Sequence, residues 1–323
     1  MLLRIFNNKN RLLQFFLIAL ASSSLFFLPI NVIPSNGFNP LYDLFLNIIG
    51  NNSVVIRIVF ILLITIPIIL TQYFAVFFGI IQRNYFHFFF LAPILIFSNE
   101  SAWTLNPTLF ALLFLVIGVA NLFQLNRTES PIVISSTSFI FSIASLFYSI
   151  FIWNILLIII ALFIFREFKL RELIMAIGSF VLPYIYIFTW YFVDDILLIK
   201  WNEFINQIFD FSFNITLSSS FLHLFFIAII ILLTLYLIIS IFNSLRNKLI
   251  QVREYLSFFL VTFLFSIILL LIAGSNTPYQ FMIIQFLIAF LYSVHLSDNR
   301  PSWHHDIVIL LLVSHNIISI FYA

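Results

Sequence analysis

The chain has 323 residues, of which 63% are hydrophobic, 45 are phenylalanine and only 8% are charged. A soluble domain averages about 25% charged residues, and a soluble fold of this length could not hide so much apolar surface, so lipid must solvate much of the chain. The net charge of +2 is too small to indicate nucleic-acid binding, and the absence of cysteine excludes disulfides, thiolate metal sites and cysteine catalysis.

The N-terminal segment, MLLRIFNNKNRLLQFFLIALASSS, has the layout of a secretory signal peptide, with basic residues ahead of an apolar run. The apolar run continues through LFFLPI to Ile30, however, and a run of about 19 residues is long enough to cross a bilayer. We therefore expect an uncleaved first membrane span at residues 12–30.

Apolar runs separated by charged residues or by Pro, Asn and Ser predict helices along the rest of the chain. A bilayer core needs about 20 helical residues, so the runs at 84–98 and 150–165 are short. The predicted fold is all-α: a polytopic transmembrane helix bundle of about eleven spans, forming one integral membrane domain over residues 1–323. The predicted spans are 12–30, 54–81, 84–98, 108–125, 132–149, 150–165, 172–193, 218–241, 255–273, 279–296 and 306–322.

If the N-terminus is cytoplasmic and successive spans cross in opposite directions, most Lys and Arg residues fall on one side of the membrane. Only Arg57 and Lys200 then fall in outer segments, and all the other Lys and Arg residues fall in inner ones. An excess of Lys and Arg marks the cytoplasmic loops of membrane proteins. We expect a multi-pass protein of a bacterial inner (cytoplasmic) membrane, with its N-terminus in the cytoplasm and its C-terminus in the periplasm.

Two shorter segments predict interfacial helices on the outer face. In residues 39–50, Asn39 suits an N-cap, Pro40 the first helical position and Gly50 the C-terminal stop, and the helix is too short to span. Its apolar face holds Leu41, Leu44, Phe45, Ile48 and Ile49. The second segment is 194–211, with an apolar stripe of Trp201, Phe204, Ile205 and Ile208 and a polar face of Lys200, Glu203, Asn206, Gln207 and Asp210.

The acids of this outer rim are the candidates for chemistry. Asp43 could act as a general base or metal ligand, or it could simply favour the first turn of its helix through the helix dipole. Asp194 and Asp195 could hold a divalent cation that bridges to a phosphate, or they could end one helix and cap the next. Arg57 would supply positive charge beside them.

The remaining ionisable groups indicate no known active site. His304 and His305 suit an interfacial polar cluster, and His223 and His315 suit interhelical hydrogen bonds. There is no Cys ligand, no Glu-x-x-His pair, no Walker sequence and no G-x-S-x-G motif, so we expect neither a metal nor a cofactor. The span interiors lack the carboxylates that ion-coupled transporters and proton pumps usually carry.

One resemblance lies in the stretch that begins at Ser136 and runs through SLFYSIFIWNILLIIIALFIFREFKLRELIMAIGSFVLPYIYIFTWYF. It is similar to an uncharacterised bacterial family of polytopic inner-membrane proteins, a domain of unknown function. That family has a similar Phe-Lys/Asn-x-Arg-Glu step followed by a Gly…Leu-Pro-Tyr span, and its closing segment is similar to GSNTPYQFMIIQFLIAFLYS. The resemblance implies no particular activity.

A second resemblance lies in NPLYDLFLNIIGNNSVVIRIVFILL. This stretch looks like the first outer loop and second span of GT-C type glycosyltransferases, which use polyprenol-phosphate sugars. In those enzymes a similar Pro-Leu-Tyr helix follows a segment that carries the catalytic Asp or Glu. Here that segment, Asn31–Asn39, contains no acid, and Asp43 lies inside the helix.

Three classes of function remain open at this point. The first is a non-enzymatic accessory or scaffold component of a membrane complex, with the lipid bilayer and another membrane protein as partners. The second is a GT-C-like transferase of lipid-linked sugar or lipid, and the third a transporter of a lipid-like solute. A lateral groove beside Asp43 and Asp194 would favour the second, a closed outer rim with an apolar side patch the first, and a central polar cavity the third.

Overall fold

The computed structural model describes most of the chain after the first predicted span. The described residues are 31–33, 37–50, 52–82, 85, 87–98, 103–127, 131–166, 169–209, 221–272, 277–298 and 303–322. Of these, residues 31, 221–226, 272, 277–278, 304 and 315–322 are described by their backbone only. The predicted span at 12–30 and Asp210 lie outside the described residues.

Helices make up nearly all of the described structure, which confirms the all-α prediction. The α-helices are α3 (Pro40–Ile49), α4 (Ser53–Phe77), α5 (His87–Ile96), α6 (Pro107–Gln124), α7 (Pro131–Phe147), α8 (Ile155–Phe165), α9 (Leu170–Val193), α10 (Leu197–Phe209), α11 (Phe221–Ser244), α12 (Ile250–Ile272), α13 (Thr277–Asp298) and α14 (Trp303–Tyr322). Two 3₁₀ helices, η2 (Ser149–Asn154) and η3 (Leu245–Asn247), and two strands, β1 (Asn31–Val32) and β2 (Thr104–Leu105), complete the order.

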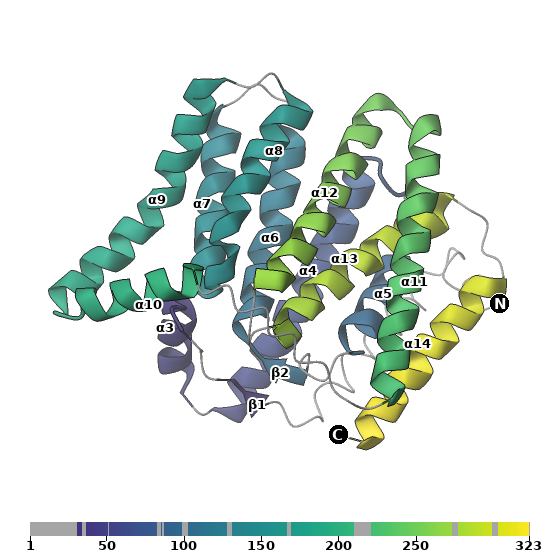
Figure 1. Ribbon diagram of the computed structural model, residues 1–323, viewed down its shortest axis with the longest axis horizontal. Coiled ribbons are helices and arrows are strands. Elements are labelled where there is room, and N and C mark those ends of the chain that lie inside the picture. The colour runs from purple at the N-terminus through teal and green to yellow at the C-terminus, as the bar shows by residue number, and fades with distance from the viewer. Residues whose placement is uncertain are drawn as a thin grey trace.

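The long helices run side by side, and their connections alternate between two ends of the molecule (Figure 1). α10 lies across the lower end, with α3 and the two strands near it. Within the described part of the chain, six helices are long and apolar enough to cross a membrane: Ser53–Phe77, Pro107–Gln124, Leu170–Val193, Ile227–Asn247, Ile250–Leu271 and Tyr279–Asp298. The chain is therefore a helical membrane protein.

Basic residues gather at the end opposite α3 and α10. The connections from α6 to α7, from α8 to α9 and from α11 to α12 lie at the upper edge of Figure 1. Apart from Arg57 and Lys200, the cations of the described part of the chain lie in or beside these three connections: Arg127, Arg166, Lys169, Arg171, Arg246, Lys248 and Arg253.

The helices differ greatly in how much protein surrounds them. In the most apolar 18-residue stretch of α13, 94% is buried inside the protein, whereas the corresponding shares are 22% in α9 and 17% in α11. Phe286 of α13 packs edge-on against Phe88 of α5, and Phe290 lies 4.0 Å, ring centre to ring centre, from Phe259 of α12. α13 is thus a central helix, whereas α9 and α11 leave wide apolar faces for lipid.

Two connections differ from the predictions. β1 pairs with β2 in parallel, and the Ile33 amide donates to the Leu105 carbonyl at 3.1 Å. Tyr42 of α3 covers this pair, because its hydroxyl lies 2.8 Å from the Ile33 oxygen and 2.9 Å from the Leu105 oxygen. The predicted spans 132–149 and 150–165 follow one another without a gap, and in the structure the 3₁₀ helix η2 joins α7 to α8 there.

Candidate functional site

Aromatic side chains recur every four residues along one face of α9. Phe180, Tyr184 and Phe188 follow this spacing, which places successive residues on one side of a helix. Tyr184 is buried, and its hydroxyl lies 2.6 Å from the Ser145 hydroxyl of α7. The opposite side of α9 carries exposed apolar residues such as Tyr186, as expected of a helix that faces lipid.

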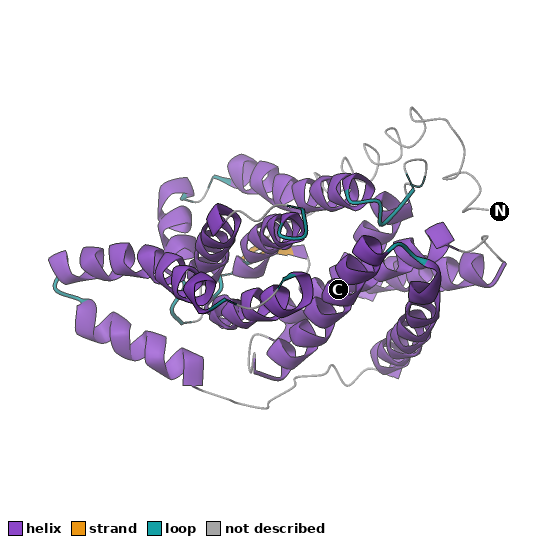
Figure 2. Ribbon diagram, turned by 90° about the horizontal axis from the view of Figure 1, so that it is seen from above, coloured by secondary structure: helices purple, strands orange, loops and turns teal. Residues whose placement is uncertain are grey.

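α10 brings a second aromatic face against α9. A short turn at Asp194–Asp195 joins the two helices, and they diverge from it at one side of the molecule (Figure 2). Phe188 lies 5.2 Å from Trp201 and 5.5 Å from Phe204, measured between ring centres. These contacts are edge-on, the geometry that aromatic pairs favour. The apolar stripe predicted for α10 therefore packs on α9 through two of its members.

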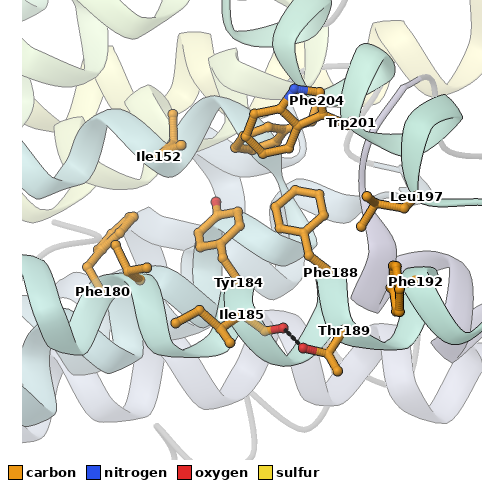
Figure 3. Close-up of a pocket in the computed structure, with 11 residues that line it drawn as sticks. Ile152, Phe180, Tyr184, Ile185, Phe188, Thr189, Phe192, Leu197, Trp201 and Phe204 are labelled. Carbon is orange, nitrogen blue, oxygen red and sulfur yellow. Dashed lines mark hydrogen bonds between the residues drawn. The ribbon is translucent and has the colours of Figure 1, made fainter.

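Between α9 and α10 lies an open groove of about 640 Å³. Figure 3 shows Tyr184 and Phe188 directed from α9 towards Trp201 and Phe204 of α10. The groove is lined by Ile152, Phe180, Val181, Tyr184, Ile185, Phe188, Thr189, Phe192, Leu197, Trp201 and Phe204. Its volume falls within the range of about 300–1,000 Å³ that small-molecule sites span.

The groove presents carbon almost everywhere. Two of its three polar side chains are already bonded inside the protein: Tyr184 to Ser145, and Thr189 to the Ile185 carbonyl at 2.6 Å. The third polar group is the indole N–H of Trp201. A charged or strongly polar ligand would lose its hydration in this groove without compensation, whereas a hydrocarbon chain would not.

The segment before α3 is tied to the far end of α10. The Phe38 amide donates to Oε1 of Gln207 at 2.5 Å, and the Phe38 ring lies 5.0 Å from that of Phe204. Gly37 has φ +94°, and a Cβ there would lie 2.7 Å from the Gln207 side chain, so only glycine fits this contact. These contacts fix α3 beside the inner end of the groove.

Asp43 lies in the first turn of α3, as predicted, and is half-buried. Its carboxylate and that of Glu203 both act electrostatically on the Tyr191 hydroxyl of α9. Glu203 also forms an ion pair with Lys200, with Nζ 2.6 Å from Oε2. Asp43 and Glu203 are therefore within electrostatic range of Tyr191, and Lys200 joins them through its ion pair with Glu203.

Asp194 and Asp195 lie elsewhere, in the exposed turn before α10. Asp194 ends α9, and Asp195 has φ +57°, a left-handed conformation that aspartate tolerates better than most residues. Gln207, which contacts the α3 segment, is ten residues beyond the start of α10, or about 15 Å along the helix. The aspartate pair and the α3 contact therefore lie at opposite ends of α10.

Arg57 lies half-buried near the start of α4. Within the described part of the chain, His, Asp and Glu form no group of three that could hold a metal ion.

Asn39 has a different role from the N-cap that the sequence predicts. Its side chain makes no capping bond to α3. Its Oδ1 instead accepts a hydrogen bond of 3.1 Å from the Ser149 amide at the start of η2. Asn39 is buried, so the bond to η2 satisfies an amide that would otherwise lack a partner. Gly50, with φ +59°, ends α3 as predicted.

His305 belongs to a polar cluster that is buried inside the protein. Its ring lies 5.1 Å from that of His295 on α13, and its Nδ1 lies 3.3 Å from the Tyr292 hydroxyl. His295 Nδ1 in turn lies 2.6 Å from the Ser240 hydroxyl of α11. The cluster links α11, α13 and α14. The side chains of His223, His304 and His315 lie outside the described residues.

The groove itself was not predicted. The four-residue aromatic spacing in α9 was the signal available for one wall, and the stripe on α10 was the signal for the other. The sequence does not show that the two faces oppose each other, because that depends on the turn at Asp195.

Comparisons with known proteins give no relative for this chain: no family model, no curated protein and no solved structure matches it.

Proposed function

We propose that this chain is a multi-pass protein of a bacterial inner membrane that binds the hydrocarbon chain of a lipid or lipid-linked molecule between α9 and α10. The observation that carries the proposal is the apolar groove of about 640 Å³, open on a side of the bundle where α9 faces lipid. Its aromatic walls, and the hydrogen bonds that Tyr184 and Thr189 already make within the protein, suit an alkyl or prenyl chain and no polar solute.

The first candidate role is a non-enzymatic accessory component that holds such a lipid for a membrane partner. The acids favour this role, because Asp194 and Asp195 lie at the opposite end of α10 from the α3 contact. Within the described residues, no three Asp, Glu or His side chains lie together as a shared metal site would require, since metal–oxygen distances are about 2–2.6 Å.

The second candidate role is a GT-C-like transferase of lipid-linked sugar or lipid. It is favoured by the position of Asp43, which lies, like Glu203, within electrostatic range of the Tyr191 hydroxyl on α9. A carboxylate at this place could take a proton from an acceptor hydroxyl while the lipid chain lies between α9 and α10. A transporter of a lipid-like solute has less support, because the groove is lateral rather than central.

Filling the groove tests the proposal. Ile185→Trp places an indole in the groove, and we expect at least a fivefold fall in the fraction of protein that retains lipid, measured by native mass spectrometry from mild detergent. Ile174→Trp is the matched control, because Ile174 is exposed on α9 and does not line the groove. Equal lipid retention in the two variants would contradict the proposal.

The orientation rests on the basic end of the molecule, which we assign to the cytoplasm. The chain contains no cysteine, so single cysteines report without background. Asn202→Cys on α10 should react with an impermeant maleimide added to intact spheroplasts, and Asn247→Cys should react only after lysis. Both positions are exposed. Labelling of Asn247→Cys alone in intact spheroplasts would reverse the assignment.

A further inference from the structure

The two walls of the groove are attached to the rest of the protein very unequally. α9 packs closely on α7, where Phe180 and Tyr184 are buried and the Tyr184 hydroxyl is bonded to Ser145. In α10, by contrast, Phe204 is the one buried residue of the 13, although the helix also rests against η2. Segments with little buried surface open at a lower free energy than the core of a protein does. α10 is therefore the wall of the groove that can move.

A pivot for such a movement lies where α9 meets α10. α9 ends in a Schellman motif, in which the Ile196 amide donates to the Tyr191 carbonyl at 3.1 Å. The Ile196 carbonyl already accepts a helical bond of α10 from the Lys200 amide. Asp195 is the left-handed residue of the motif, and among the described residues it is the only one other than glycine with a positive φ. The backbone dihedrals of Asp195 and Ile196 thus separate two rigid helices, and hinges consist of such short stretches at the ends of elements.

The other end of α10 is held by Phe38, in the segment before α3. The Phe38 amide donates to Oε1 of Gln207, and Gly37 lets the backbone approach that side chain closely. The buried Phe38 ring lies 5.0 Å from the ring of Phe204 on α10 and 5.8 Å from that of Phe188 on α9. Gln207 is about 15 Å along the helix from the pivot, so even a small rotation there moves it appreciably. Phe38 therefore holds α10 at the end where the movement would be largest.

The same contacts close the groove on one side. Phe188 and Phe204 lie 5.5 Å apart, ring centre to ring centre, which leaves no room for a chain between the two helices at that point. Parting these rings exposes them to lipid, and this costs little because lipid tails are as apolar as the rings. Breaking the bond between the Phe38 amide and Gln207 costs more, because both groups lose a partner. The hydrogen bond is thus the part of the contact that most resists opening.

We infer that α10 is a hinged lid of the groove, that it pivots at Asp195 and Ile196, and that the contact between Phe38 and Gln207 is its latch. Release of the latch lets a lipid chain enter or leave. This inference rests on the proposed function, because it states how the site for the hydrocarbon chain between α9 and α10 opens.

Spin-label distances test the lid without any knowledge of the natural lipid. The chain contains no cysteine, so labels attach only at Ile174→Cys on α9 and Asn206→Cys near the far end of α10, which are both exposed positions. Double electron–electron resonance then measures the distance between the labels in the detergent-purified full chain. We expect Gln207→Met, which removes the hydrogen-bond acceptor at similar volume, to raise the share of molecules with a longer distance at least threefold. Asn202→Leu is the matched control, because Asn202 is an exposed amide side chain of the same helix, and it should leave the distances unchanged.

Exchange of a bound lipid tests whether this movement opens the groove. The full chain is loaded with palmitoyl-oleoyl phosphatidylglycerol and mixed with an excess of the same lipid carrying deuterated chains. Native mass spectrometry follows the replacement of one lipid by the other. We expect Gln207→Met to exchange the lipid at least fivefold faster than the unchanged protein, and Asn202→Leu to exchange it at the unchanged rate.

The outcomes separate the lid from the groove. If Gln207→Met matches Asn202→Leu in both measurements, the lid is overturned and the groove stands. If the distances lengthen while the exchange rate stays the same, α10 moves without controlling the groove, and the inference is again overturned. If Ile185→Trp and Ile174→Trp retain lipid equally, the groove is refuted and the role of α10 as its lid with it, whatever movement the spin labels show.

Discussion

Replacing Glu172 by leucine is expected to destabilise the protein by about 3–5 kcal/mol, because it removes the carboxylate that pairs with the buried Arg166 guanidinium. Arg166 Nη1 lies 3.3 Å from Glu172 Oε1, and the two side chains are only 12% and 11% exposed. The Arg166 Nε also donates to the Leu125 carbonyl at 3.1 Å, so the guanidinium is held at the end of α6. A freely mobile arginine could turn to water; this one could not do so without breaking that bond.

The double variant Arg166→Met/Glu172→Leu is the control for this prediction. Replacing both partners of a buried pair with apolar side chains is often close to neutral, so the double variant should regain most of the lost stability. Unfolding in mixed detergent and SDS micelles measures both variants. A loss below about 1 kcal/mol for Glu172→Leu would mean that the pair behaves as a solvated surface pair.

Gly118→Ala is expected to destabilise the protein by about 1–3 kcal/mol, even though alanine is normally the better helix former. A Cβ at Gly118 of α6 would overlap the ring of Phe141 on α7. Phe141 is fully buried, so its ring has no free volume to move into. The methyl group must therefore push α6 and α7 apart.

Gly178→Ala is the matched substitution in α9. A Cβ there meets nothing within 4 Å, so this variant should be neutral or more stable by up to about 1 kcal/mol. Phe141→Leu combined with Gly118→Ala should recover part of the loss by making room for the methyl group. If Gly118→Ala and Gly178→Ala unfold alike, the close approach of α6 and α7 is not a feature of the protein in its membrane.

The two short rim segments show how far local pattern reaches. The predicted helix at 39–50 is found as α3 at Pro40–Ile49, and the predicted segment 194–211 contains α10 at Leu197–Phe209. Both helices can be predicted because the spacing of apolar residues acts within one or two turns of the chain. In α3, Pro40 and Gly50 act over the same short range. Their position at the surface of a membrane remains a prediction, as do the span count of about eleven and the orientation.

The sequence predicts the candidate site much less well than it predicts the helices. The sequence singles out Asp43, Asp194, Asp195 and Arg57 as candidates, but it could not show that Asp43 and Glu203 would both act electrostatically on Tyr191. Such groupings depend on how helices far apart in the chain pack together. The bond between Asn39 and Ser149 spans 110 residues, and local capping rules cannot foresee it.

By itself, the amino-acid sequence determined that lipid surrounds much of this protein and that its secondary structure is helical. In lipid, every backbone polar group must be bonded within the protein, so long apolar runs have little choice but to form helices. Only the tertiary structure decided which apolar surfaces meet. Apolar residues line both the protein-facing and the exposed surfaces here, so hydropathy does not distinguish the aromatic face of α9 that lines the groove from the face that meets the bilayer.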